Sequence, residues 1–197
     1  MNENSLLDET LALVALGGNL PSSSGRPETT LRRAIGQLAA ESGFELRAVS
    51  RFWRSPAWPL GSGPDYVNAA VALTTRHSAE AVLAILHRIE ATLGRLRDGG
   101  RWQARGIDLD LIAWGDAVLP DAGFQDAWRA LSPDEQQRIA PDRLVLPHPR
   151  MQDRGFVLAP LAEIAPGWRH PRLGLSVAQM LAALPAQALQ DMTTLNA

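Results

Sequence analysis

The chain has 197 residues, a formal net charge of −2 and 46% hydrophobic residues, values typical of a soluble globular protein with one sizeable core. It has no cysteine, which excludes disulfides, thiolate catalysis and cysteine-ligated metal centres. It also has no lysine, because all 19 basic residues are arginine, so a Schiff base and a P-loop lysine are excluded as well.

Residues 11–114 predict an alternation of strands and helices. A short apolar run at 11–16, closed by Gly17-Gly18-Asn19, indicates a buried strand that ends in a turn. The following elements are a helix at 27–40, a strand at 44–55, a proline- and glycine-rich loop at 56–64, a strand at 66–75, a helix at 78–93 and a strand at 106–114. This order is typical of the α+β class, and specifically of a ferredoxin-like βαββαβ antiparallel sheet with helices packed on it.

The second half of the chain is expected to be mostly helical. Residues 115–143 contain two short helical patches, at 124–131 and 133–139, and the second opens with the capping-box arrangement of Ser132 and Glu135. Further helices are expected at 153–163 and 176–184, whereas the tail at 185–197 shows no strong pattern. We expect one domain, 1–197, with a core at about 11–184, a helical insertion at about 115–143 and C-terminal helices.

The most informative segment runs from Arg95 to Asp110 and holds four arginines, one tryptophan and two alternating aspartates. Side chains two positions apart on a strand share a face, roughly 6.6 Å apart along the chain, so Asp108 and Asp110 project together. Mg²⁺ prefers one or two carboxylates plus substrate phosphates, and arginine forks bind phosphate oxygens. The pattern favours phosphoryl chemistry on a nucleotide, but spacing alone leaves open a structural carboxylate pair beside a solvated basic loop.

A series of short motifs in sequence order resembles one known family. They are Leu16-Gly-Gly-Asn19, Pro64-Asp-Tyr-Val-Asn-Ala-Ala70, Arg88-Ile-Glu90, Gly94-Arg95, Arg101-Trp102, Arg105-Gly-Ile-Asp-Leu-Asp110, Pro147-His148 and Arg154-Gly-Phe156. Over about 11–166, with a break at 115–143, the chain is similar to the 6-hydroxymethyl-7,8-dihydropterin pyrophosphokinases of folate biosynthesis. The resemblance implies transfer of pyrophosphate from ATP to the pterin hydroxymethyl group, with release of AMP, on a ferredoxin-like fold.

The resemblance also implies roles for individual residues. Two Mg²⁺ ions are expected at Asp108 and Asp110, which are expected to be catalytic together with Arg95 and Arg105. ATP, the co-substrate, is expected to contact Glu90, Arg95, Arg97, Trp102, Arg105, Arg143, His148 and Arg154. The pterin is expected to stack between Tyr66 and Phe156, with Asn68 at its edge and Trp102 closing over the site. For Glu90, a carboxylate on the helix surface is the alternative interpretation.

Two other functions remain open at this point. One is a non-catalytic pterin- or nucleotide-binding paralogue, which the intact set of aspartates and arginines disfavours. The other is a different metal-dependent nucleotidyltransferase, against which Tyr66, Asn68 and Phe156 indicate a pterin. The insertion at 115–143 is hypothesised to form a surface helical hairpin beside the nucleotide entrance.

Partners other than small molecules are not indicated by the sequence. The net charge of −2 argues against nucleic acid, and no apolar run approaches the ~18 residues of a membrane helix. The polar, acidic N-terminus lacks the features of a secretory signal. We therefore expect a cytoplasmic, monomeric protein that binds ATP and a pterin.

Overall fold

The computed structural model describes residues 9–57, 61–95, 106–132, 135 and 138–195. The predicted site residues Arg97, Trp102 and Arg105 lie outside these ranges. All other site residues predicted from the sequence lie within them. No helix in the described ranges is long and apolar enough to cross a membrane.

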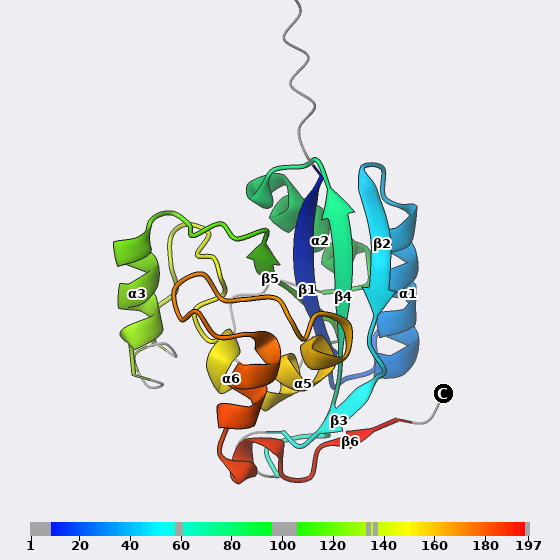
Figure 1. The fold of residues 1–197 in the computed structure, drawn as a ribbon. Coiled ribbons are helices and arrows are strands. Elements are labelled where there is room, and N and C mark those ends of the chain that lie inside the picture. Colours follow the sequence, from blue (N-terminus) through cyan, green and yellow to red (C-terminus); the bar gives the residue numbers. More distant parts are fainter. Residues whose placement is uncertain (1–8, 58–60, 96–105, 133–134, 136–137, 196–197) are drawn as a thin grey trace, which may run out of the picture.

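An antiparallel sheet forms the centre of the fold (Figure 1). Its strands are β1 (Thr10–Gly18), β2 (Phe44–Val49), β3 (Trp53–Ser55), β4 (Tyr66–Thr75), β5 (Asp108–Trp114) and β6 (Thr193–Thr194). The strand order is β5-β1-β4-β3-β6, and β2 also pairs with β4. The mixed α/β architecture and the antiparallel sheet confirm the predicted class, and the order is compatible with a ferredoxin-like arrangement.

Helices cover both faces of this sheet (Figure 1). They are α1 (Pro27–Ala40), α2 (Ala79–Thr92), α3 (Ala122–Ala130), α5 (Gly155–Ile164) and α6 (Val177–Ala183), with short 3-10 helices η1 (Met151–Asp153) and η2 (Ala186–Leu189). Helices α1 and α2 pack on one face, and α5 and α6 on the other. Helix α3 lies to one side of these layers, beyond β5.

The core consists of two apolar clusters, one on each face of the sheet. Along β1, Ala12, Val14 and Leu16 belong to the cluster under α1 and α2, whereas Leu13 belongs to the cluster under α5 and α6. This division follows from the strand geometry, in which successive side chains point to opposite faces. The central strands β1 and β4 are therefore apolar on both sides, which leaves the strand ends for polar groups.

The expected strand at 44–55 is interrupted. Between β2 and β3, the Ser50 hydroxyl accepts from the Ala70 N–H over 2.9 Å, and the Arg51 N–H donates to the Glu163 carboxylate over 2.8 Å. The Ser50 N–H still donates to the Ala70 carbonyl over 2.9 Å, so side chains add to the backbone bonds at Ser50 and bind the backbone N–H of Arg51. The expected turn at Gly17 and Gly18 was also wrong, because both residues belong to β1. The tail, for which the sequence shows no strong pattern, contains η2 and β6.

The two helical patches of the insertion are only partly tested. Helix α3 confirms the first patch, with Asp121 as its N-cap. In the second, Glu135 and Arg138 are helical, and the Ile139 N–H donates to the Glu135 carbonyl over 3.0 Å. The Ser132 and Glu135 side chains bond each other's backbone N–H groups over 3.3 and 2.9 Å, which is the reciprocal pattern of a capping box.

Candidate active site

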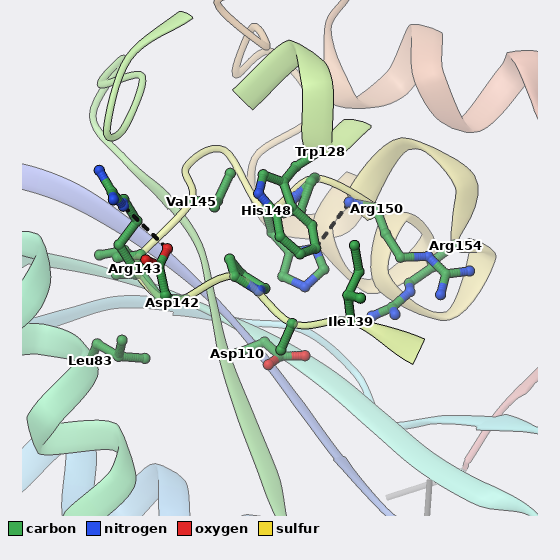
Figure 2. A pocket seen from close by; sticks show the side chains of 15 residues that line it. Leu83, Asp110, Trp128, Ile139, Asp142, Arg143, Val145, His148, Arg150 and Arg154 are labelled. Atoms are coloured by element: carbon green, nitrogen blue, oxygen red, sulfur yellow. Dashed lines mark hydrogen bonds and ion pairs between the residues drawn. The ribbon is translucent and has the colours of Figure 1, made fainter. Parts of the chain in front are cut away.

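Two cavities of the described structure share residues at their junction. The first, here called the aromatic cavity, measures about 500 Å³ and is lined in part by Tyr66 and Phe156. The second, here called the arginine cavity, measures about 540 Å³ and is lined in part by three arginines, Arg143, Arg150 and Arg154 (Figure 2). The residues that line both cavities are Asp110, His148 and Arg154.

The aspartate pair lies at this junction because β5 carries it to the end of the sheet. Asp108 and Asp110 are both half-buried and alternate with the buried Leu109 on the strand, as the sequence predicts. Asp108 lines the aromatic cavity, and Asp110 lines both cavities. The two carboxylates therefore face the place where ligands in the two cavities would meet.

A glycine forms the floor between the aspartates and the aromatic side. Gly17 on β1 pairs with Asp108 on β5 and with Asn68 on β4, so the three residues form one row across three strands. Gly17 has no side chain to fill the space above the sheet, and it lines the aromatic cavity. The row thus places a carboxylate and an amide on either side of an open floor.

Asn68 is oriented by its neighbours. Its Nδ2 donates to the Ser55 hydroxyl over 2.9 Å, and the residue is 4% exposed. A Cβ at Gly17 would lie 3.5 Å from Oδ1, so this oxygen lies on the Gly17 side of the residue. A buried amide oxygen at the cavity wall is an acceptor for a ligand N–H group.

Arg95 and Glu90 connect helix α2 to the aspartate strand. The Arg95 Nη1 donates to the Asp108 carboxylate over 2.5 Å and also to Glu90. Glu90 is 1% exposed and accepts from the Leu109 N–H over 2.7 Å. Burial lowers the pKa of Arg95, but the Asp108 and Glu90 carboxylates outweigh this effect and raise it overall. Arg95 is therefore a fixed cation beside Asp108.

The burial of Glu90 excludes the interpretation of a helix-surface carboxylate. The residue lines neither of the two cavities. Its contacts are with Arg95 and the β5 backbone. A role in holding the site follows directly from these contacts, and its predicted contact with ATP stays a prediction.

His148 and Arg154 provide polar groups at the junction. His148 Nδ1 accepts from the Arg150 N–H over 3.2 Å, which leaves Nε2 as the protonated nitrogen of the neutral ring. Burial lowers the pKa of His148 to about 3, and the nearby Arg154 and Arg150 act in the same direction. Burial also lowers the pKa of Arg154, while Asp110 opposes this effect. His148 is consequently a neutral hydrogen-bond donor and Arg154 a cation.

The aspartate pair fits a magnesium site that substrate phosphates complete. In the ranges that the structure describes, no group of three or more His, Asp or Glu side chains could form a metal cage. Mg²⁺ does not need such a cage, since it keeps several waters and is bound by one or two carboxylates plus phosphate oxygens. Asp108 and Asp110 supply the carboxylates for this mode of binding.

Several of the residues that line the two cavities were not predicted from the sequence. The arginine cavity is also lined by Trp128, Ile139 and Arg150, and the aromatic cavity by Gln187, Gln190 and Met192. An aromatic residue on a short amphipathic helix was a usable signal for Trp128. The tail offers no comparable signal, because its position depends on the pairing of β6 with β3.

Of the predicted binding residues that the structure describes, six line the two cavities, whereas Glu90 and Arg95 line neither. Tyr66, Asn68 and Phe156 line the aromatic cavity, whereas Arg143 lines the arginine cavity, and His148 and Arg154 line both. A flat-ring site and a phosphate site that meet at two carboxylates are the features of a two-substrate phosphotransferase. The fold and the site together define this class.

Comparison with known proteins defines the family. The model of the 7,8-dihydro-6-hydroxymethylpterin-pyrophosphokinase (HPPK) family matches residues 13–166. This chain belongs to that family, as its sequence motifs indicate.

Curated relatives support this assignment over most of the chain. A Synechocystis sp. protein named 2-amino-4-hydroxy-6-hydroxymethyldihydropteridine pyrophosphokinase is 38% identical over 178 residues, which are 90% of this chain and 78% of the relative. Proteins of the same name from Methylorubrum extorquens and Pseudomonas aeruginosa are 36% and 34% identical. The alignments cover 80% and 90% of this chain, and 84% and 93% of those relatives.

Solved structures with a similar fold include HPPK-DHPS proteins. The wild-type HPPK-DHPS of Plasmodium falciparum superimposes with a TM-score of 0.59 at 12% identity, covering 89% of this chain and 44% of that one. Its complex with SDX-DHP gives a TM-score of 0.62 at 11% identity, with the same coverage. This chain thus spans less than half of these proteins, and the likeness supports the fold alone.

Proposed function

We propose that this chain transfers the pyrophosphate group of ATP to 6-hydroxymethyl-7,8-dihydropterin and releases AMP, a step of folate biosynthesis. Membership of the HPPK family and the names of the curated relatives support this function. The observation that carries it to the atomic level is the position of Asp110, which lines both the aromatic and the arginine cavity. A phosphate bound beside Asp110 could therefore contact a ligand in the aromatic cavity while belonging to a ligand in the arginine cavity.

The aromatic cavity would hold the pterin. Tyr66 and Phe156 offer ring faces for stacking on a flat heterocycle, and the Asn68 amide oxygen would accept from its N–H groups. Phe156 is 40% exposed, which is unusual for a large apolar side chain and leaves its ring accessible to a ligand. With the ring so bound, the hydroxymethyl group would point toward the aspartates.

The arginine cavity would hold ATP, with its phosphates at the junction. Arg154 would contribute charge, and His148 would donate a hydrogen bond through Nε2. Asp108 and Asp110 would hold two magnesium ions. Magnesium, when bound, would neutralise phosphate charge and polarise the phosphoryl oxygens.

The chemistry requires mainly positioning. The hydroxymethyl oxygen forms a bond to the β-phosphorus, the bond between that phosphorus and the α,β-bridging oxygen breaks, and the hydroxyl proton passes to solvent. Fixed cations and donors such as Arg95, His148 and Arg154 would stabilise the charge on the phosphates as this bond breaks. The resemblance assigns Arg97 and Arg105 to binding of the ATP phosphates, Arg105 also to catalysis, and Trp102 to folding over the nucleotide. These roles stay proposals.

Product analysis with ATP, magnesium and 6-hydroxymethyl-7,8-dihydropterin tests the function. AMP should form in step with pterin consumption, and chelation of magnesium by EDTA should stop the reaction. ADP as the product would indicate transfer of one phosphoryl group, and inorganic pyrophosphate would indicate nucleotidyl transfer. A protein that binds both ligands without reaction would be a binding paralogue. A cytoplasmic location and a monomeric state stay predictions.

A further inference from the structure

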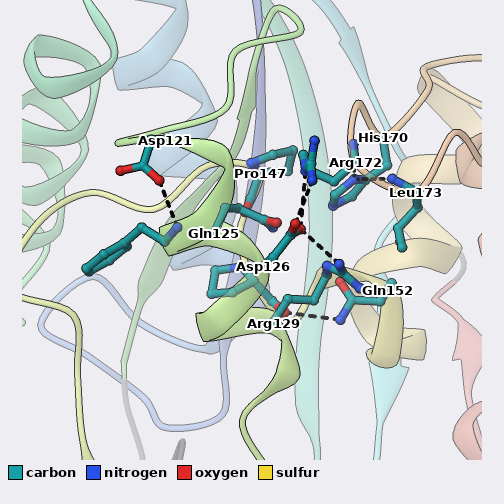
Figure 3. Close-up of polar contacts among 11 residues, drawn as sticks. Asp121, Gln125, Asp126, Arg129, Pro147, Gln152, His170, Arg172 and Leu173 are labelled. Carbon is teal, nitrogen blue, oxygen red and sulfur yellow. Dashed lines mark hydrogen bonds and ion pairs between the residues drawn. The ribbon is translucent and has the colours of Figure 1, made fainter.

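Helix α3 is attached to the rest of the molecule by directional polar contacts. Gln125 is fully buried, and its Nε2 donates to the Pro147 carbonyl over 3.2 Å. Asp126 accepts from Arg172 over 2.5 and 3.2 Å, so the helix is tied to the loop after α5 (Figure 3). Among the described residues of α3, none belongs to either apolar core cluster. These polar contacts hold the helix in place beside the core.

Apolar side chains of the insertion instead face the arginine cavity. Trp128 on α3 and Ile139 after it both line this cavity, and Ile139 is 48% exposed. In Figure 2 the Trp128 ring is drawn across the cavity from Asp110. The Trp128 ring also packs beside the Phe124 ring, with ring centres 6.2 Å apart. Side chains that line a cavity wall are positioned to contact a ligand in that cavity.

Helix α3 also contacts the surroundings of Arg143 and His148, two residues that the family resemblance assigns to ATP binding. The Arg143 guanidinium lies 5.2 Å from the centre of the Phe124 ring on α3. Gln125 holds the carbonyl of Pro147, the residue directly before His148. Helix α3, the Arg143 guanidinium and the backbone next to His148 are therefore connected by direct contacts.

We propose that Trp128 is a nucleotide-binding residue whose indole ring packs against the nucleoside part of ATP in the arginine cavity. This inference rests on the proposed function, which places ATP there. The face of an aromatic ring carries partial negative charge, so it suits a base or ribose and disfavours phosphate. The phosphates would have other partners, namely His148, Arg154 and the magnesium that Asp110 would hold.

Equilibrium binding of a non-hydrolysable ATP analogue with magnesium tests the proposal. Trp128→Ala should weaken binding of the analogue about tenfold, in the range found for aromatic stacking on a base. Trp128→Phe should retain most of the affinity, because it keeps a ring. Inorganic tripolyphosphate, which lacks the nucleoside, should bind the wild type and Trp128→Ala equally. Ala127→Gln, an exposed change on the same helix that lines neither cavity, is the matched control.

The outcomes separate this inference from the proposed function. If the wild type does not bind the analogue, the function itself fails. If it binds and Trp128→Ala binds equally well, only the role of Trp128 is overturned. An equal loss of tripolyphosphate affinity in Trp128→Ala would also overturn it, since that result would reflect a general disturbance of the cavity.

Discussion

Arg95 donates to the Asp108 carboxylate over 2.5 Å, and the same guanidinium nitrogen contacts the buried Glu90. The carboxylate at the edge of the sheet is thus oriented by helix α2 before any nucleotide is present. Because Glu90 also accepts from the Leu109 N–H, the strand and the arginine are held by one side chain. A small displacement of this helix end would be passed directly to the aspartate pair.

Removal of either aspartate charge should stop the reaction while the fold remains. Asp108→Asn and Asp110→Asn keep side-chain size but lose a carboxylate at the cavity junction, so we expect kcat to fall at least about a hundredfold. Circular dichroism and thermal unfolding should stay near those of the wild type. Asp116→Asn, an exposed change just after β5, is the control. Turnover at the wild-type rate in either cavity variant would disprove the metal-binding assignment.

Phe156→Ala should weaken pterin binding selectively. The ring lines the aromatic cavity and is 40% exposed, so its loss removes a stacking surface with little change in the core. We expect the pterin KM to rise about tenfold and the ATP KM to change little. Leu175→Ala, at a residue of 38% exposure that lines neither cavity, is the matched control. A lower Tm with an unchanged pterin KM would instead indicate that Phe156 serves only in packing.

Gly155→Ala should change the shape of the aromatic cavity by displacing η2. A Cβ at this position would lie 2.3 Å from the Ala188 carbonyl oxygen, so η2 must move. Ala188 lines the cavity, and we therefore expect a higher pterin KM and a lower Tm. Gly167→Ala, where no atom lies within 4 Å of the added carbon, should change neither. Equal behaviour of the two variants in both assays would show that the C-terminal segment does not shape the site.

His170 should make the protein less stable in acid. Its imidazole is fully buried, and Nδ1 accepts from the N–H groups of Arg172 and Leu173 over 3.1 and 3.3 Å (Figure 3). Burial, and then the charge of Arg129, lowers its pKa to about 4. Between pH 6.5 and 4 the unfolded chain binds a proton that the folded chain does not. The free energy of unfolding should therefore fall as pH decreases through this window.

Denaturant unfolding at pH 8 and pH 5 measures this effect. His170→Asn retains an acceptor but does not titrate, so its loss of stability between these pH values should be smaller by about 1–2 kcal/mol. At pH 8, where the histidine is neutral in both states, the variant reports only the packing change. An identical pH dependence in the variant and the wild type would exclude His170 as a source of acid sensitivity.

Local patterns predict the elements whose own residues determine them. The helix at 27–40 matches α1 and the strand at 66–75 matches β4 to the residue, because apolar spacing and, in α1, the proline in the first turn act within the segment. The alternation of Asp108 and Asp110 is confirmed for the same reason. The motifs that indicated the family are confirmed by the family match at 13–166.

The misses depend on contacts between distant segments. The strand at 44–55 is broken because Glu163, more than a hundred residues away, binds the Arg51 N–H. Glu90 is buried only because Arg95 and the Leu109 N–H pair with it. Trp128 reaches the arginine cavity because Gln125 and Asp126 dock its helix. None of these partners can be identified from the spacing of residues within one segment.

The pairing of β6 with β3 has a consequence for synthesis of the protein. The residues that close the aromatic cavity, Gln187, Gln190 and Met192, come from the last part of the described chain. Translation proceeds from the N-terminus, and earlier parts of a chain fold first. Tyr66 and Phe156 are therefore translated before the residues that complete the aromatic cavity, and the cavity takes its final form only after Thr194 pairs with Trp53.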